Sequence, residues 1–164
     1  MKVFFCQPGY TYRIFKDPDD VLTYGMQWYE VLRGSDDYWK PRVFVRPGEI
    51  RTPSKEALNG HRYVATRAGT TAAREPEWLT EDGAEVSDGG VIWTELGAED
   101  RLATSTWDAG GLTPTNDVID TTGCVAQVTL AGLEAGQEYT VTNSIISVQG
   151  KHKDQSFTIV VRQN

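Results

Sequence analysis

The sequence has few of the residues on which catalytic and metal sites usually depend. Among its 164 residues are only two cysteines, Cys6 and Cys124, and two histidines, His61 and His152. The cysteines lie far apart and form no CxxC motif, so we expect both to be reduced. The histidines lie in different parts of the chain and are expected to be polar surface residues rather than metal ligands.

Sequence motifs of catalysis are also missing. The chain contains no GxSxG, no HExxH and no phosphate-binding loop. Carboxylates cluster at residues 17–20 and 81–85, but without the spacing of a calcium loop. Glu95, Glu99 and Asp100 would form a paired-carboxylate site only if folding brought two of them about 5–9 Å apart in a cleft. We therefore expect a protein that is not an enzyme and that uses no cofactor and no metal.

Long apolar runs and an excess of positive charge are absent as well. The net charge of −7 excludes a general nucleic-acid binder. No apolar run approaches the roughly 20 residues of a membrane-spanning helix, so membrane insertion is not expected. The apolar patch at residues 3–5 is too short for a signal peptide. Hydrophobic residues make up 39% of the chain, too many for a disordered protein, and the length fits one domain or two small ones.

What the chain does contain is a series of short strands separated by turn residues. Alternating apolar residues predict strands at 124–130, 138–147 and 155–161, after a strand that carries Trp107. These give only four or five strands, whereas a small sandwich needs about seven. A strand must therefore come from upstream, and the segment "DPDDVLTYGMQW" is the natural donor because Gly25 weakens a helix there. The sequence predicts an all-β sandwich or barrel.

The middle of the chain predicts a small β-unit with a strand at 61–66 and a hairpin that turns at Asp88-Gly89-Gly90. Its large aromatic side chains are Tyr63, Trp78 and Trp93. Such a small unit needs buried aromatics as its core. The alternative is that these three residues form an exposed platform that stacks against a host glycan or contacts a partner.

The middle of the chain also contains a set of aromatic, glycine and small polar residues in a characteristic order. They are Tyr63, Ala65, Thr66, Gly69, Thr70, Thr71, Glu75, Pro76, Trp78, Gly83, Asp88, Gly89, Val91 and Trp93. This pattern resembles a small β-module that is widespread in phage tail and fibre proteins and that is similar to the carbohydrate-binding domains of chitinases.

The flanking regions contain three motifs. The first motif is Asp17, Pro18, Asp19, Val21, Leu22 and Tyr24, and the second is Ala103, Thr104, Ser105 and Trp107. The closing motif is Ala135, Gly136, Tyr139, Val141, Thr142, Asn143, Gly150, Ser156, Phe157, Ile159 and Val161. Together they resemble the phage fibre-to-tail adaptor family, which has an immunoglobulin-like fold. Several motifs in the same order make this resemblance the more specific of the two.

The resemblance also implies a domain organisation. In the adaptor family the first motif runs on shortly into the second, whereas here about residues 35 to 98 lie between them, so the β-module looks inserted into a loop of the sandwich. We expect an immunoglobulin-like sandwich from residues 16–34 plus 98–164, and an inserted module with a proline-rich lead-in at 35–97. In that lead-in, Arg42, Arg46 and Arg51 could pair with an acidic neighbour.

An N-terminal arm is expected at residues 1–15, where aromatic residues have little polar cover and would form an exposed strip on a lone monomer. The candidate residues for contact with a neighbouring subunit, or for cover by the sandwich, are Phe4, Phe5, Tyr10, Tyr12 and Phe15.

The resemblance implies a virion structural protein of a tailed phage that is made in the host bacterial cytoplasm and resides in the neck or tail. Its partners would be neck, tail or fibre proteins and further copies of itself in a homo-oligomer. The alternative is a carbohydrate-binding protein that aids adsorption to the host surface.

Overall fold

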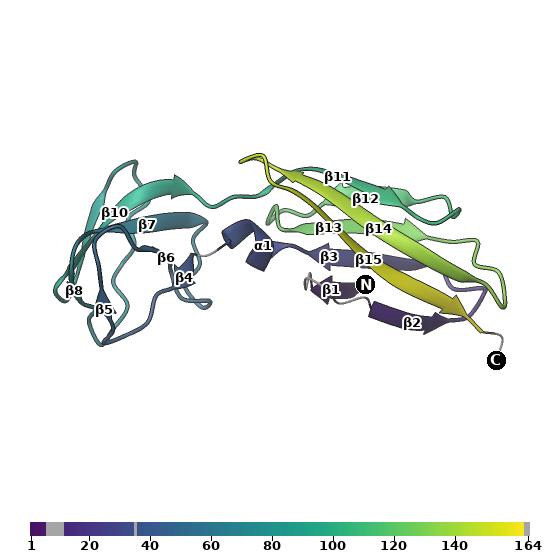
Figure 1. Cartoon of the computed structure of the whole chain (residues 1–164), viewed down its shortest axis with the longest axis horizontal. Coiled ribbons are helices and arrows are strands. Elements are labelled where there is room, and N and C mark those ends of the chain that lie inside the picture. The colour runs from purple at the N-terminus through teal and green to yellow at the C-terminus, as the bar shows by residue number, and fades with distance from the viewer. Residues whose placement is uncertain (6–11, 35, 163–164) are drawn as a thin grey trace. The chain divides into compact units, whose positions relative to one another are not determined.

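The computed structural model describes residues 1–5, 12–34 and 36–162. These residues form two compact units, one of residues 1–32 and 100–164 (unit 1) and one of residues 33–99 (unit 2). Both are built almost entirely of strands (Figure 1). No helix in the described ranges has the length and apolar character needed to cross a membrane.

Unit 1 is a sandwich of two four-stranded sheets. One sheet has the order β1-β3-β13-β12, with β1 at Lys2–Phe5, β3 at Leu22–Gln27, β13 at Val125–Leu130 and β12 at Thr115–Ile119. The other has the order β11-β14-β15-β2, with β11 at Leu102–Asp108, β14 at Glu138–Ser147, β15 at His152–Val161 and β2 at Tyr12–Lys16. Figure 1 shows the two sheets as layers. The predicted all-β sandwich is confirmed, while an immunoglobulin-like strand order stays a prediction.

The core of unit 1 forms where the inner faces of its two sheets meet. In β14, Val141 and Ile145 are buried and alternate with more exposed residues, as a strand with one covered face requires. Phe157 of β15 is fully buried and contacts aromatic rings of the opposite sheet, with centroids 4.5 Å from Phe4 and 5.3 Å from Tyr24.

The strand expected upstream is β3, which pairs antiparallel with β13 through the register Tyr24–Val128 and Met26–Ala126. The expected pairing of residues 17–28 with the C-terminal region is therefore confirmed. After β3 the chain forms the short helix α1 at Tyr29–Arg33. The predicted donor segment thus supplies a strand at residues 22–27, and the helix lies just beyond it.

The arm expected at residues 1–15 is corrected by the strand pairing. β1 pairs in parallel with β3 and β2 pairs in parallel with β15, so the described parts of this segment belong to the two sheets of unit 1. Phe4 is 2% exposed and lies in the core. The aromatic strip was expected either to contact a neighbouring subunit or to be covered by the sandwich. Phe4 is covered by the sandwich.

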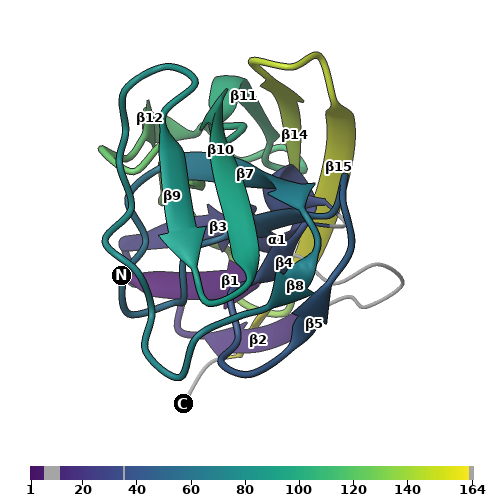
Figure 2. The ribbon, with the colours of Figure 1, turned by 90° about the vertical axis from the view of Figure 1, so that its left-hand side faces the viewer.

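Unit 2 has a five-stranded sheet and a two-stranded one. The first has the order β4-β6-β7-β10-β9, with β4 at Asp37–Tyr38, β6 at Ile50–Thr52, β7 at His61–Arg67, β10 at Val91–Ala98 and β9 at Glu85–Asp88. The second pairs β5 at Phe44–Val45 with β8 at Gly69–Thr70. Figure 2 looks onto the hairpin of β9 and β10. The predicted strand at 61–66 and the predicted hairpin are both present.

Candidate functional site

The three aromatic residues expected to contact a glycan or a partner meet in unit 2. The ring centroids of Tyr63 and Trp78 are 4.4 Å apart, and Trp78 meets Trp93 edge to face at 6.0 Å. Tyr63 and Trp93 are fully buried, and Trp78 is partly buried against the same core. A sugar ring stacks on an exposed aromatic face, so only Trp78 retains any surface for such a contact. The arrangement agrees with the interpretation of these residues as a core.

A buried carboxyl group holds this core together. Asp88 is 1% exposed, and its Oδ2 accepts hydrogen bonds from the indole Nε1 of Trp39 at 2.8 Å and of Trp93 at 2.9 Å. Its Oδ1 accepts a third from the backbone amide of Ala72 at 2.7 Å. One carboxyl group therefore satisfies three donors that would otherwise lie buried without an acceptor.

Glycines close to Asp88 explain part of the motif on which the predicted β-module resemblance depends. Gly89 has φ of 59°, and a Cβ there would lie 2.4 Å from the carbonyl oxygen of Thr70. A Cβ at Gly69 would lie 2.3 Å from the backbone of Gly90. Both positions need glycine because the hairpin turn and β8 approach at backbone distance. The motif therefore has a structural cause that needs no ligand.

The acidic residues considered as a paired-carboxylate site have separate partners. Glu95, in unit 2, lies 2.7 Å from Nδ1 of His61 and accepts hydrogen bonds from the amides of Gly97 and Gly83. The hydrogen bond from His61, followed by those from the two amides, lowers the pKa of Glu95, although burial opposes the shift.

Asp100, in unit 1, has its own surroundings. Its Oδ1 accepts hydrogen bonds from the amides of Arg101 and Gln149, and its Oδ2 lies 3.5 Å from Nζ of Lys151. No group of three potential metal ligands occurs within the described ranges. These contacts give Asp100 a structural role within unit 1.

The lowered pKa of Glu95 predicts how the stability of unit 2 depends on pH. A carboxyl group whose pKa is lower in the folded state stabilises the fold above its unfolded-state pKa, and this contribution is lost as the pH falls through the folded-state pKa. We expect Glu95→Gln to lower the free energy of unfolding by about 1–3 kcal/mol at pH 7. The difference from the wild type should shrink progressively below pH 4.5, the ordinary pKa of the group.

Urea denaturation of both proteins between pH 3 and pH 7 would measure this difference. The exposed Glu85→Gln is the matched control, and its stability should follow that of the wild type at every pH. A Glu95→Gln defect of the same size at both ends of the range would contradict the prediction.

The residues of the expected N-terminal arm are placed as follows. Phe4 is a core residue, Tyr12 packs against the core, and Phe15 is 51% exposed on the outer side of β2. The guanidinium of Arg162 lies over the ring of Phe15, 4.0 Å from its centroid. Phe5 lies in β1, and Tyr10 falls outside the described residues, as does Cys6. A role of Tyr12 or Phe15 in contacts between subunits stays a prediction.

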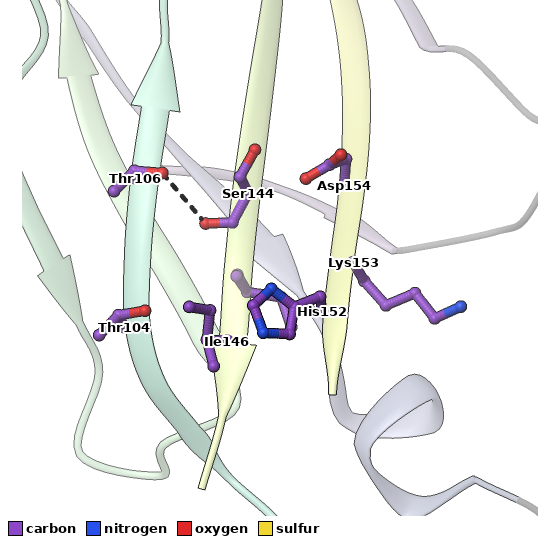
Figure 3. A pocket seen from close by; sticks show the side chains of 8 residues that line it. Thr104, Thr106, Ser144, Ile146, His152, Lys153 and Asp154 are labelled. Atoms are coloured by element: carbon purple, nitrogen blue, oxygen red, sulfur yellow. Dashed lines mark hydrogen bonds between the residues drawn. The ribbon is translucent and has the colours of Figure 1, made fainter. Parts of the chain in front are cut away.

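The outer face of the β11-β14-β15 part of unit 1 carries a shallow hollow (Figure 3). The strand register sets Thr104, Ile146 and His152 in one row across the three strands. The next row has Thr106 and Asp154 on either side of Ser144, whose carbonyl accepts a hydrogen bond from the Thr106 hydroxyl at 3.4 Å. His152 is thus exposed at the surface, as expected. The hollow is lined by Thr104, Thr106, Ser144, Ile145, Ile146, His152, Lys153 and Asp154.

This face is open and mixed in composition. Hydroxyl side chains, His152, Lys153 and Asp154 surround an exposed apolar residue, Ile146, and Val148 is 61% exposed just beyond the end of β14. Reaction centres bring together acids, bases or nucleophiles in a cleft. Here Thr106 and Ser144 lie on an open sheet.

Sequence reasoning missed a buried polar link between the two sheets of unit 1. The indole Nε1 of Trp28 donates to Oδ1 of Asn143 at 2.8 Å, and Nδ2 of Asn143 donates to Oγ of Ser105 at 2.8 Å and to the carbonyl of Thr106 at 3.1 Å. Asn143 and Ser105 both belong to the motifs of the adaptor resemblance. The sequence feature that could have indicated this link is an asparagine at an inward-facing position of an otherwise apolar strand.

Comparison with known proteins gives one family. Residues 81–160 match the family model described as podophage GP4 fiber-tail adaptor protein gp77. The match begins in the loop before β9 and ends within β15, so it includes the hairpin of Asp88, the outer face with its hollow, and Asn143. No curated protein and no solved structure matches the chain.

Proposed function

We propose that the chain, whose residues 81–160 match the model of the podophage fibre-tail adaptor family, is the virion part that joins the fibre to the tail, in several symmetric copies. We further propose that the outer face of β11, β14 and β15 makes the joining contact. The family match is the observation that supports a structural role in the virion. The fold agrees with it, because the described residues form an all-β structure of several sheets.

The outer face supports the contact because of its shape and composition. Interfaces between proteins combine a central apolar anchor with a polar surround. Ile146 is 38% exposed between Thr104 and His152, and all three residues line the hollow beside hydroxyl and charged side chains. The face also lies wholly within the residues that match the family model.

Host glycan binding, the alternative function, has less support from the geometry. Two of the three rings proposed to stack on sugar have no exposed face, and the indole Nε1 of Trp78 donates to Glu75 at 2.8 Å. Glu75 in turn accepts from the amide and hydroxyl of Ser54. The aromatic cluster is thus committed to the fold of unit 2.

The proposed function predicts that a charge at Ile146 prevents assembly. Particles made without this protein would be supplied with purified chain, and the fibres bound per particle would be counted by immunoblot and electron microscopy. Wild-type chain should restore the fibres. Ile146→Glu should lower fibre attachment at least about tenfold, because an unpaired charge in an interface costs about 2–5 kcal/mol.

The matched control is Val118→Glu, which charges an apolar residue of the other sheet that is 50% exposed. It should restore fibres as the wild type does. Two results would contradict the proposal. Particles that retain their fibres without the protein would exclude the adaptor role, and an Ile146→Glu chain that restores fibres fully would exclude this contact face.

A further inference from the structure

One end of unit 2 carries exposed arginines around an exposed aromatic ring. β5 pairs with β8 through Phe44 and Thr70, and the amide of Gly90 in the β9–β10 turn donates to the carbonyl of Thr70 at 2.9 Å. These contacts bring β5, β8 and the turn together at the same end (Figure 2). We call this the arginine end, and it comprises Arg42, Phe44, Arg46 and Arg67.

The side chains of the arginine end face solvent. Val45 is 1% exposed and points into unit 2, so its neighbour Phe44 points outward and is 61% exposed. All three arginines are exposed, and none of them forms an ion pair with another described residue. Arg67 makes only a hydrogen bond from Nε to the carbonyl of Gly90, at 3.0 Å.

The opposite end of the β9–β10 hairpin is acidic. The sequence from Glu75 to Asp100 contains no lysine and no arginine. The loop into β9, which we call the acidic loop, carries exposed carboxylates that form no ion pair within the described ranges. They are Glu77, Glu81, Asp82 and Glu85.

The two charged surfaces are held apart by the hairpin. Glu85 pairs with Thr94, and the carbonyl of Ala84 accepts from the amide of Glu95. The turn at Gly89–Gly90 lies at the other end of the same strands. β9 has four residues, so at about 3.3 Å per residue Glu85 lies about 10 Å along the strand from the residue that begins the turn. Within the described ranges no ion pair joins the arginine end to the acidic loop of the same unit.

We propose that the arginine end of one copy binds the acidic loop of unit 2 in a second copy, head to tail. Arginine pairs with carboxylates through two parallel hydrogen bonds, and Phe44 supplies the apolar anchor that such interfaces use. A head-to-tail contact closes into a ring when its rotation permits. The inference rests on the proposed function in one respect, which is that an adaptor is present in several copies.

The first measurement is the self-association of the whole chain by sedimentation velocity over a range of salt concentrations. We expect association at low ionic strength and an apparent dissociation constant at least about tenfold weaker at 0.5 M salt, because exposed charges are screened. A chain that stays monomeric at every protein and salt concentration overturns the inference.

Charge reversal then tests the two surfaces. The variant R42E/R46E/R67E and the variant E81K/D82K/E85K should each lose self-association at low salt, because each then carries two ends of the same sign. Mixed in equal amounts, they should associate again, since the arginine end of the second fits the acidic loop of the first. Circular dichroism would check that both are folded, as expected for exposed positions.

Reversal of three exposed basic residues elsewhere, in K2E/K55E/R101E, is the control for net charge and should leave self-association intact. Association retained in either reversed variant, or a mixture that stays monomeric, overturns the inference. Fibre attachment separates this inference from the proposed function. A reversed variant that is monomeric at low salt could still enter the particle and restore fibres. That result would show that assembly does not need the head-to-tail contact, and it would leave the adaptor role intact.

Discussion

Replacing Asp88 with alanine is expected to unfold unit 2 while unit 1 remains folded. The substitution removes the acceptor of two indole N–H groups and one backbone amide, all inside the core. A buried donor without an acceptor costs about 1–3 kcal/mol, so we expect a loss of about 3–5 kcal/mol. Unit 2 comprises residues 33–99, and a core of that size rarely supplies more than about 3–5 kcal/mol of stability. The loss would therefore consume most of it.

Amide NMR spectra of the whole chain would show which unit has unfolded. Resonances of unit 2 should collapse to unfolded positions, while those of unit 1 should keep their dispersion. Asp82→Ala, which removes an exposed carboxylate from the same unit, should leave the spectrum native. If Asp88→Ala keeps dispersed unit 2 resonances and the wild-type melting temperature, the carboxyl group does not have the role assigned to it.

Asn143→Ala is expected to cost unit 1 about 2–4 kcal/mol. The change leaves the Trp28 indole without an acceptor and the Thr106 carbonyl without this donor, and Asn143 is fully buried. Urea denaturation monitored by circular dichroism would measure the loss. The neighbouring Thr142→Ala, which affects only a hydroxyl contact with Ser156 on the outer side, should cost less than about 1 kcal/mol.

A double-mutant cycle makes this second prediction specific. The double variant Trp28→Phe/Asn143→Leu removes both polar partners. It should lose less free energy of unfolding than the two single variants together, because each single variant leaves the other partner buried without its hydrogen bond. The expected coupling is about 1–2 kcal/mol. Strictly additive losses would mean that the Trp28–Asn143 hydrogen bond does not stabilise the sandwich.

Local patterns in the sequence were sufficient for much of the fold. β14 and β15 have alternating apolar residues that are buried on one face, and the Asp-Gly-Gly turn set the hairpin of β9 and β10. The adaptor resemblance, confirmed by the family match, was carried by residues whose spacing now has a structural cause, such as Asn143.

The remaining elements could not be predicted because their cause is not local. β1 and β2 pair in parallel with strands of unit 1, and β2 meets β15, a strand near the other end of the chain. β12 has no alternation, since four of its five residues are exposed. The helix α1 has five residues, which is too short for a period of 3.6 residues to be recognised.

The candidate surfaces were less accessible to sequence analysis than the fold. The three arginines of the lead-in were noted as a possible match for an acidic neighbour, but Arg51 pairs with Asp37 and Glu49. Arg67, which does belong to the arginine end, lies outside the lead-in. The residues of the arginine end lie close together because β5 pairs with β8. Both strands have only two residues, so no periodicity in the sequence indicates this contact.

The strand order of unit 1 also constrains how the chain folds as it leaves the ribosome. β2 needs β15 as its partner, and the register Tyr12–Phe157 joins residues 145 positions apart (157 − 12). Unit 2, in contrast, has all its strands once residue 99 has emerged. We therefore expect unit 2 to fold during synthesis, before β2 can pair with β15, and we expect the closing of such long-range sheets to be the slow step. Until β15 has emerged, the aromatic residues of β1 and β2 would lack their partners and would favour aggregation of the nascent chain.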